Sequence, residues 1–587
     1  MVVAAKLSRL CRTSGLVLLG LMAACAPQEP RDARDATPSF PPSAAARVDS
    51  HGQVGGELRY ALAGEPDTFN YLAASDNRSK LVALLTSGTL LEFDAFAQQV
   101  TGGVADEYRL EGDGASVWLH LRDGLTFSDG RPVSSEDVAF SFDRLFDPAS
   151  HNVLKDSLMV GGEPLRLEVV GDRELIVHAN RPYAAIEYLL SNVPILPRHC
   201  LTDFSDRPIE EAWTLSTPPS EMAGLGPFKV SRHDPGIATT LERNPYYWKV
   251  DTSGTPLPYL DRVVLEYVSD RSAQVLRLSS GNLDLADQLR PEDFVLLQGR
   301  EDLIAEDLGP SSNLSFLLFN LNDPRGAVRT REHGWFSKQA FRRAISSALN
   351  RQAIAGTVYS GLASPAFSFV SPANRHWYVD VGDLPDHDVD EARRLLAGAG
   401  FSWREDGDRT VLLDEGGAPV EFDLLTLSSD VLGRTAAVVR QDLSVIGIQA
   451  HIRQEEFRSV ISRITRSRDF ACAIMNLDFP LEPLDMANVL LTSGDFHVWR
   501  LPGGGDPEPW ELDMDRIVGE LATTGAPQAR FALFERVQRI MAQQCPLIPL
   551  VNRNVLVVRR QSIQDLEVAR VFPYAWARVW QVYQEQL

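Results

Sequence analysis

The chain has few cysteines, few clustered cations and no long apolar run after its first 25 residues. Only five of its 587 residues are cysteine, and none forms a CxxC pair (Cys11, Cys25, Cys200, Cys472 and Cys545). A disulfide framework or a zinc ribbon is therefore not expected. At most one disulfide could join the last three cysteines, and buried free thiols are the simpler expectation.

Basic side chains are also scarce relative to acidic ones. The sequence has 57 Lys plus Arg against 79 Asp plus Glu, a formal net charge of −22. Binding to nucleic acid depends on clustered cations, so nucleic acid is excluded as the main partner. The remaining composition, 44% hydrophobic and 23% charged, is that of an ordinary globular protein. The length is typical of about three to four domains.

Sequence motifs of catalysis are missing as well. The chain contains no GxSxG, HExxH or GxxxxGK[ST], and no GxGxxG after a strand pattern. Its 11 histidines are scattered, as His199 is after Pro197 and Arg198, and none has a second His or Cys at a convincing metal-ligand spacing. No catalytic residue, metal or cofactor is expected, and an enzyme would need a site assembled from remote segments.

What the sequence does contain begins with an export signal. Three cations precede a short apolar stretch, residues 15–22, which is too short to span a membrane. Residues 1–24 are therefore predicted to be a signal peptide. Residues 21–25 (LMAAC) are similar to a bacterial lipobox, which implies that Cys25 is diacylated after cleavage. A plain signal peptide with an incidental cysteine is the alternative.

A polar linker follows. Residues 25–53 are rich in Pro, Ala, Asp and Ser and have almost nothing to bury, which is typical of an extended, disordered tether. No later segment approaches the length needed to cross a membrane. Residues 54–587 are therefore predicted to be periplasmic or at the cell surface, and to be held at a bacterial membrane through the lipid anchor only.

Strand and helix patterns alternate along the rest of the chain, which indicates an α/β fold. Residues 55–62 alternate as a strand does, and residues 117–127 predict a β-hairpin around an Asp-Gly pair. Residues 134–145 predict a capped amphipathic helix. Residues 421–453 have a complete strand–helix–strand pattern, which implies part of a parallel sheet.

Seven segments, taken in order, resemble those of one protein family. Residues 121–141 (LRDGLTFSDGRPVSSEDVAFS) are similar to the family signature. The other six segments are 224–229, 241–248, 281–286, 341–351, 392–401 and 443–448. Together they resemble the extracytoplasmic solute-binding proteins of ABC importers, in the oligopeptide, dipeptide and nickel-binding class.

The resemblance implies a two-lobed periplasmic-binding-protein fold of type II, with a hinge between the lobes and an extra domain. By analogy, lobe I would comprise residues 54–99, 224–308 and 537–587, the extra domain 100–223, and lobe II 309–536. Such a protein acts as a monomer without a cofactor. A ligand in the cleft selects the closed form, which the permease subunits recognise.

The resemblance also implies where a ligand binds. In peptide-binding members, an Asp of lobe II pairs with the α-ammonium of the peptide. Here Asp478 has the matching position, in the segment 475–483 (MNLDFPLEP), and Asn476 precedes it. A desolvated carboxylate needs a cation, so Asp478 would favour an amine-bearing ligand. The alternative is an Asp that only caps a loop.

Four further residues are candidates for ligand binding. Trp499, close to His497, is expected either to stack against a ring, sugar or peptide plane, or to pack in the core of lobe II. Asp76 and Asn77 follow the first strand, where family members approach their ligands. Three functions stay open: a peptide receptor of an importer, a receptor for a sugar or other small solute, and a surface sensor or enzyme that keeps the fold.

Overall fold

A computed structural model describes residues 45–152, 154–204, 207–323, 327–382 and 386–585. The predicted signal peptide, Cys25 and most of the predicted linker lie outside these residues. The described residues belong to one compact unit, Phe40–Leu587. None of the helices in it is both long and apolar enough to cross a membrane.

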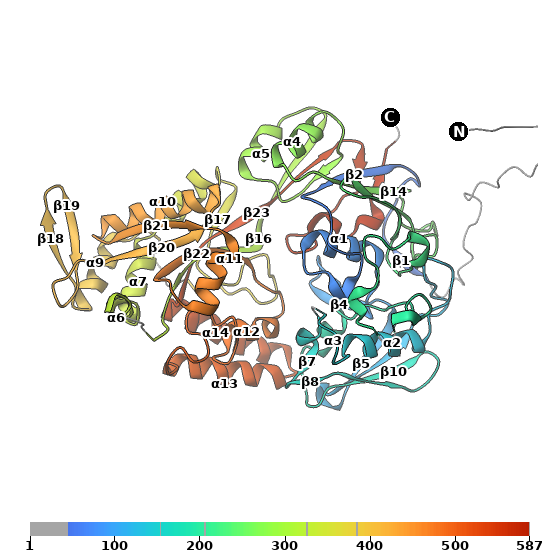
Figure 1. The fold of residues 1–587 in the computed structure, drawn as a ribbon, viewed down its shortest axis with the longest axis horizontal. Coiled ribbons are helices and arrows are strands. Elements are labelled where there is room, and N and C mark those ends of the chain that lie inside the picture. The colour runs from blue at the N-terminus through green and yellow to red at the C-terminus, as the bar shows by residue number, and fades with distance from the viewer. Residues whose placement is uncertain (1–44, 153, 205–206, 324–326, 383–385, 586–587) are drawn as a thin grey trace, which may run out of the picture. The chain divides into compact units, whose positions relative to one another are not determined.

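A mixed sheet of eleven strands forms the frame of this unit (Figure 1). Its strands, in spatial order, are β11 (Phe228–Asp234), β12 (Ala238–Arg243), β14 (Arg262–Tyr267), β2 (Glu57–Leu62), β15 (Leu285–Ala286), β23 (Leu547–Arg560), β16 (Leu303–Phe319), β22 (Cys472–Asp478), β20 (Glu421–Leu427) and β21 (Gln449–Glu455), with β17 (Ala363–Pro365) beside β23.

Two long antiparallel strands, β16 and β23, join the two halves of this sheet. β23 pairs with β15 on the lobe I side, and β16 pairs with β22 on the lobe II side. Their mutual register shifts between Asp307 and Pro310 and again before Leu314. Such irregularities bend a strand, so the crossing has the backbone geometry of a bend between lobes.

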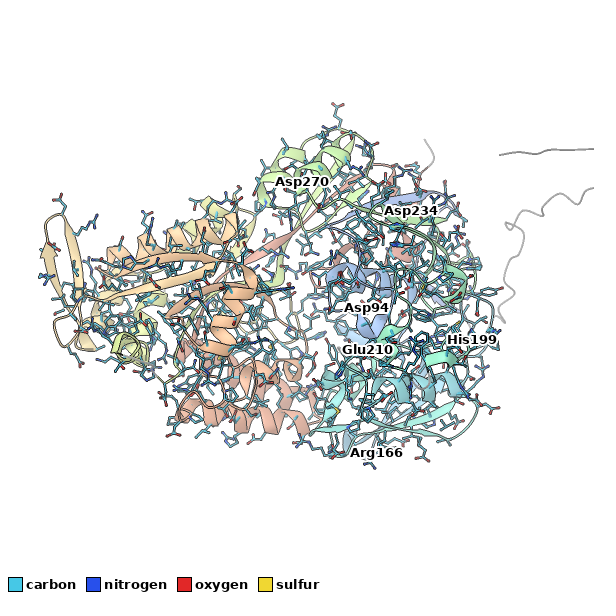
Figure 2. The ribbon with its side chains drawn as sticks, viewed as in Figure 1. Asp94, Arg166, His199, Glu210, Asp234 and Asp270 are labelled. Atoms are coloured by element: carbon cyan, nitrogen blue, oxygen red, sulfur yellow. The ribbon has the colours of Figure 1, made fainter. Side chains whose placement is uncertain are left out.

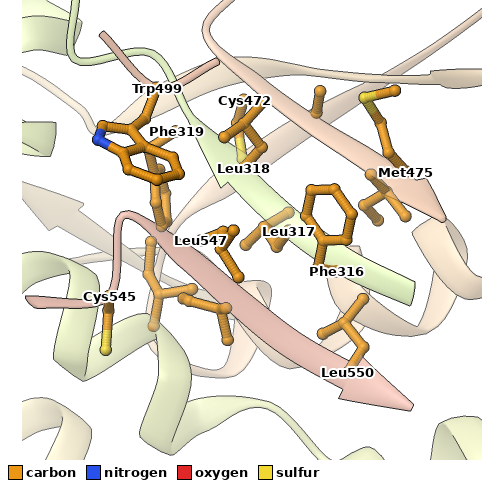
Figure 3. Packing of buried hydrophobic residues seen from close by; sticks show 14 of the residues in the cluster. Phe316, Leu317, Leu318, Phe319, Cys472, Met475, Trp499, Cys545, Leu547 and Leu550 are labelled. Atoms are coloured by element: carbon orange, nitrogen blue, oxygen red, sulfur yellow. The ribbon is translucent and has the colours of Figure 1, made fainter. Parts of the chain in front are cut away.

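Two large hydrophobic cores lie on either side of this crossing. The lobe I core contains Leu58, Val263 and Val557 and extends without a break into the extra domain through Val117 and Phe142. The lobe II core is built around the paired strands β16 and β23. Trp499 lies beside Phe319 of β16, and Leu547 and Leu550 of β23 lie near the run Phe316–Phe319 (Figure 3).

Residues near the C-terminal boundary expected for lobe II pack in two different cores. Phe534, Val537 and Met541 on α14 (Pro527–Gln544) pack in the lobe II core, as do residues 547–551 of β23. Only from residue 555 onwards does this part of the chain pack in the lobe I core. The apolar face of α14 covers lobe II, so residues 537–551 pack with lobe II and not with lobe I.

The extra domain is organised around a four-stranded antiparallel sheet. The strand order is β5 (Ala105–Glu111), β6 (Ser116–Leu121), β10 (Glu174–His178) and β9 (Arg166–Val169). The predicted helix is α2 (Ser135–Leu145), which begins with a capping box from Ser134 and buries Val138, Phe142 and Leu145.

The hairpin predicted over residues 117–127 is wrong. Both edges of β6 are already paired, with β5 and with β10, so no edge is left for residues 125–127. These residues instead belong to a separate tight turn, in which the Phe127 amide donates to the Arg131 carbonyl at 2.8 Å. Gly130, with φ of +90°, provides the left-handed conformation that this turn requires.

The predicted strand–helix–strand unit is confirmed. β20 and β21 run parallel in register, from Glu421 beside Gln449 to Leu427 beside Glu455, and α10 (Asp430–Val445) connects them. Other long helices of lobe II are α7 (Gln339–Ala348), α9 (Val389–Gly398) and α13 (Pro509–Thr523).

The remaining elements lie around this frame. The helices are α1 (Asn77–Thr86), α3 (Ile186–Leu190), α4 (Arg271–Ser279), α5 (Pro291–Leu297), α6 (Ala327–Phe336), α8 (Arg351–Ala353), α11 (Phe457–Ser462) and α12 (Ala487–Leu490). The strands are β1 (Ala46–Val48), β3 (Leu91–Asp94), β4 (Gln99–Gly102), β7 (Met159–Val160), β8 (Glu163–Pro164), β13 (Lys249–Asp251), β18 (Ser402–Asp406), β19 (Arg409–Leu413), β24 (Ile563–Gln564) and β25 (Tyr583–Gln584).

The three cysteines in the described part of the chain are free thiols, and no two of them form the disulfide that the sequence left open. Cys472 and Cys545 are buried, and Cys200 is partly exposed.

Candidate functional site: the cleft between the lobes

A cavity of about 780 Å³ lies where lobe I, the extra domain and a short segment of lobe II meet. Cavities of this size commonly hold small-molecule ligands. Lobe II contributes Ser312 and residues 478–481 to its wall, and lobe I contributes most of the rest. Aromatic rings from widely separated segments line it: Tyr71, Phe93, Phe96, Tyr188, Tyr247, Trp248, Phe479, Phe572, Trp576 and Trp580.

Asp478 reaches this cavity from the end of a central strand. It is the last residue of β22 and lies opposite Asn313 of β16. The next residue, Phe479, is buried and packs edge-on against Phe316 and Phe369, with ring centroids 6.2 and 5.9 Å apart. This anchor fixes the backbone just after the strand, so the Asp478 carboxylate is held at the cavity wall.

The Asp478 carboxylate has only neutral hydrogen-bond donors. Its Oδ1 accepts from the Ser312 hydroxyl at 3.5 Å and from the Tyr574 hydroxyl of lobe I at 3.3 Å. Burial, with a smaller contribution from the charge of Asp478, raises the pKa of Tyr574 to about 12, so this hydroxyl stays protonated. Among the described residues, no Lys, Arg or His forms an ion pair with Asp478. Its charge is therefore uncompensated where it faces the cavity.

Four other charged side chains of the cavity wall form two ion pairs. Lys249 Nζ lies 2.7 Å from a carboxylate oxygen of Glu92, and Arg578 lies 3.2 Å from Asp94. Figure 2 labels Asp94 at the centre of the view. These pairs leave little net charge on the lobe I wall, whereas Asp478 has no ion-pair partner among the described residues.

The two lobes touch directly beside the cavity. Gln98 of lobe I donates from Nε2 to the Ala373 carbonyl at 2.7 Å, and its Oε1 accepts from the Arg375 amide at 2.9 Å. His376 Nε2 lies 2.9 Å from the Ala97 carbonyl. These contacts hold the lobe I loop against a loop of lobe II, so they favour the arrangement in which the lobes are together.

A second cluster of carboxylates lies where the extra domain meets lobe II. Glu482 forms a buried ion pair with Arg530. Asp485 keeps contact with solvent but is closely surrounded by protein, and this desolvation, together with the charge of Glu482, raises its pKa to about 7. Burial also raises the pKa of Glu187, whose buried Oε2 has no hydrogen-bond partner among the described residues. This interface therefore holds more negative than positive charge.

Trp499 and His497 lie inside lobe II and do not line the cavity. Both side chains are fully buried. The Trp499 indole donates to Glu511 Oε1 at 3.0 Å, and His497 Nε2 lies 3.2 Å from the same oxygen. With no exposed ring face, Trp499 has the placement of the core alternative and cannot stack on a ligand in this cleft.

The other sequence candidates are also absent from the cavity wall. Asp76 caps α1, where its Oδ1 accepts from the amides of Arg78 and Ser79, and Asn77 is the exposed first residue of that helix. Asn476 lies on β22, two residues before Asp478, and is half-buried opposite Ser315. Of the six predicted ligand-binding residues, the structure brings Asp478 alone to this cavity.

The aromatic wall of the cavity was missed by the sequence analysis. Its rings come from segments as far apart as Tyr71 and Trp580, and no local spacing marks them as a group. A weak signal was available in the aromatic runs 246–248 and 574–580, but aromatic runs are equally common in cores.

Comparisons with known proteins support this fold. A probable ABC transporter-binding protein of Deinococcus radiodurans is 26% identical over 434 residues, which cover 71% of this chain and 72% of the relative. The oligopeptide-binding protein AppA of Bacillus subtilis, solved with a nonapeptide, has a TM-score of 0.68 at 21% identity, covering 91% of this chain and 100% of that one.

A third protein shows the same fold with a different ligand. The periplasmic binding protein MelB of Agrobacterium fabrum, solved in complex with stachyose, has a TM-score of 0.66 at 20% identity and covers 92% of this chain and 86% of that one. Similarity at these identities shows the two-lobed periplasmic-binding-protein fold, which confirms the predicted fold class.

The family assignment comes from the sequence itself. The family model described as bacterial extracellular solute-binding proteins, family 5 middle, matches residues 99–496. This match spans more than half of the chain, and it includes the signature segment, α2 and the strand that ends at Asp478. The chain belongs to family 5 of the bacterial extracellular solute-binding proteins.

Proposed function

We propose that this protein is the substrate-binding component of an ABC importer and that it captures peptides in the cleft between its lobes. The observation that carries the proposal is Asp478, a carboxylate at the cavity wall with two neutral donors and no cation. A peptide α-ammonium supplies the missing positive charge and several N–H donors. The relatives named for peptide binding and for ABC transport support the same assignment.

Binding and closure are coupled in this proposal. Asp478 and Ser312 belong to the lobe II side of the cavity, whereas Tyr574 and most of the aromatic wall belong to lobe I. A ligand that touches both sides binds the closed arrangement more tightly than the open one and therefore shifts the population toward it. The permease subunits then receive the closed form. No catalytic step is part of this function.

A sugar receptor is the second candidate, because three tryptophans lie in the lobe I wall. Trp580 is partly exposed and can offer a flat apolar face to a sugar ring, whereas Trp248 and Trp576 line the wall but are only 3% and 5% exposed. The likeness to a stachyose-binding protein supports this alternative. Trp580 therefore replaces Trp499 as the stacking candidate.

The experiment is identification of the bound ligand. The full chain is purified without denaturation, its ligand is released by heat and identified by mass spectrometry, and candidate ligands are then titrated calorimetrically into the parent protein and the Asp478→Asn variant. Short peptides whose binding depends on Asp478 would support the first proposal. A saccharide that binds both proteins equally would favour the second, and turnover of a released compound would overturn both in favour of an enzyme.

The proposal extends to localisation and domain organisation. The protein is a monomer in the periplasm or at the cell surface, anchored through diacylated Cys25, with its lobes divided within β16 and β23. Replacing Cys25 with Ala should abolish the incorporation of labelled fatty acid while leaving the folded domains intact. Persistent labelling would contradict the anchor.

A further inference from the structure

Three side chains with metal-ligand atoms meet on the extra domain, outside the cleft. The ligand atoms of Asp129, His199 and Cys200 all lie within 4.8 Å of one another. Asp129 Oδ2 is 2.7 Å from His199 Nε2. All three residues keep contact with solvent, and Figure 2 shows His199 at the right-hand edge of the view. A cation from solution can therefore reach the cluster.

The first ligand is held by a tight turn. The Phe127 amide donates to the Arg131 carbonyl at 2.8 Å, which closes the turn around Asp129. Asp129 Oδ1 accepts from the Arg131 amide at 3.1 Å, so its other oxygen, Oδ2, is the one directed at His199. The His199 ring packs edge-on against Phe127, with centroids 5.5 Å apart. The orientation of both ligands is thus set by neighbouring contacts.

The other two ligands come from a short 3-10 turn, Arg198–Cys200. The Arg198 amide donates to Asp137 Oδ1 at 3.1 Å, which ties this turn to the first turn of α2. The Cys200 amide donates to the Pro197 carbonyl at 3.0 Å. Two consecutive residues of this anchored turn therefore present an imidazole and a thiol toward Asp129.

We propose that Asp129, His199 and Cys200 form a binding site for a divalent cation of borderline softness, for which Zn²⁺ is the best match. One carboxylate oxygen, one imidazole nitrogen and one thiolate sulfur are all ligands that Zn²⁺ accepts, and three protein ligands leave a fourth tetrahedral position for water. A hard cation such as Mg²⁺ would not select the sulfur.

Charge balance fits this assignment. A thiolate and a carboxylate together carry two negative charges, which a divalent cation neutralises. The Cys200 thiol gives up its proton when it binds a cation as a thiolate. The nearby charged groups include Arg131, which opposes the cation, and Asp137, which favours it.

The site would act on the extra domain and not on the cleft. A bound cation joins the turn around Asp129 to the turn Arg198–Cys200, two segments separated by about 70 residues of sequence. The inference is therefore independent of the ligand that the protein transports. No metal site was expected from the sequence, because His199 and Cys200 are adjacent and their third partner is remote.

Cobalt substitution provides the test. The probe is Co²⁺, titrated into the metal-free full chain carrying Cys11→Ser and Cys25→Ser, so that the thiols left are those of the described part. The expected result is one Co²⁺ per chain, with near-ultraviolet thiolate-to-cobalt charge-transfer absorption that Zn²⁺ abolishes. Cys200→Ser should remove this absorption, and His199→Gln should weaken Zn²⁺ binding by about tenfold or more.

A matched control lies in the same domain. His178 Nε2 is 3.0 Å from Glu168, a histidine–carboxylate pair that the structure places without a thiol. His178→Gln should leave Co²⁺ and Zn²⁺ binding unchanged. If Cys200→Ser does not fold, Asp129→Asn serves instead, because Asn retains the Oδ1 acceptor of the turn. A missing charge-transfer band, a band that survives Cys200→Ser, or equal losses in His178→Gln and His199→Gln would overturn the site.

Discussion

Two carboxylates of lobe II, Glu511 and Asp478, have opposite surroundings. Glu511, in the first turn of α13, is fully buried and accepts hydrogen bonds from Trp499, His497 and Arg500, the last at 2.9 Å, and from the Glu508 amide at 2.6 Å. Asp478, at the end of β22, is exposed to the cavity and has two long contacts with hydroxyl groups.

The difference separates a structural carboxylate from one available to a ligand. Burial alone would raise the pKa of Glu511, but its hydrogen bonds from His497 and Glu508 and the charge of Arg500 lower the pKa below its usual value of 4.5. The fold has supplied every donor that this group needs. At Asp478 the fold supplies no cation, so a cationic ligand gains more there than it would at a saturated site.

The largest effect in this comparison is expected from Glu511→Gln. The variant removes the buried charge partner of Arg500 and leaves it only the more exposed Glu508 at 3.5 Å, so the free energy of unfolding should fall by about 3 kcal/mol. Denaturant titration at pH 7 measures it. Because the pKa of Glu511 is lowered in the folded state, its stabilisation is present above about pH 4.5 and is lost as the pH falls, so the difference between parent and variant should shrink in acid.

Glu535→Gln is the control for this variant. Glu535 forms an exposed ion pair with Arg539 one helical turn away, and such pairs contribute roughly 0.5 kcal/mol or less. If Glu511→Gln and Glu535→Gln unfold at the same denaturant concentration, the buried cluster does not stabilise lobe II.

Asp478→Asn should weaken ligand binding and leave the stability of the protein unchanged. Peptide affinity should fall by about tenfold or more, which is roughly 1.4 kcal/mol, while the denaturation midpoint stays the same. Isothermal calorimetry with the peptide recovered from the purified protein measures the change. Asp49→Asn is the matched control, because Asp49 also lines the cavity but is almost fully exposed. Unchanged affinity in Asp478→Asn would remove this carboxylate from the site.

The same comparison shows which site residues could be predicted from the sequence. The segment around Asp478 could be identified because it resembles a family segment. His497 and Trp499 were equally visible in the sequence, yet their role depends on burial, which a pattern of polar and aromatic residues does not determine. A motif that looks suited to a ligand can instead be a buried hydrogen-bond network.

Fold elements were predictable to the extent that local periodicity determined them. The unit over residues 421–453 and the helix α2 were predicted because each has its own caps and apolar face. The hairpin at 117–127 failed because strand pairing is decided by distant partners, here β5 and β10. The point where the chain passes from lobe II to lobe I is hard to predict for the same reason, since the packing of α14 depends on helices and strands far away in the sequence.

Gln98→Ala should give a smaller effect, on closure and not on ligand recognition. The variant removes two hydrogen bonds between the lobes, to Ala373 and Arg375, at a cost of about 1 kcal/mol in the closed form. Affinity should therefore weaken by about fivefold, with the same preference among peptides. Gln99→Ala, at an exposed neighbouring position, is the control. A changed peptide preference would show that Gln98 contacts the ligand instead.

Asp485→Asn should show its effect as a pH dependence of stability. Desolvation and the charge of Glu482 raise the pKa of Asp485 to about 7 in the folded state, above its usual value of 3.8. The folded protein then holds a proton that the unfolded chain has released, so stability falls as the pH rises between these two values and is level above them. In the Asn variant this part of the slope should disappear, so thermal denaturation midpoints measured from pH 4.5 to 8 should vary less than in the parent.

Asp495→Asn, at an exposed position of the same lobe, is the control and should keep the parent slope. Identical slopes in parent and Asp485→Asn would mean that Asp485 ionises freely in the folded protein.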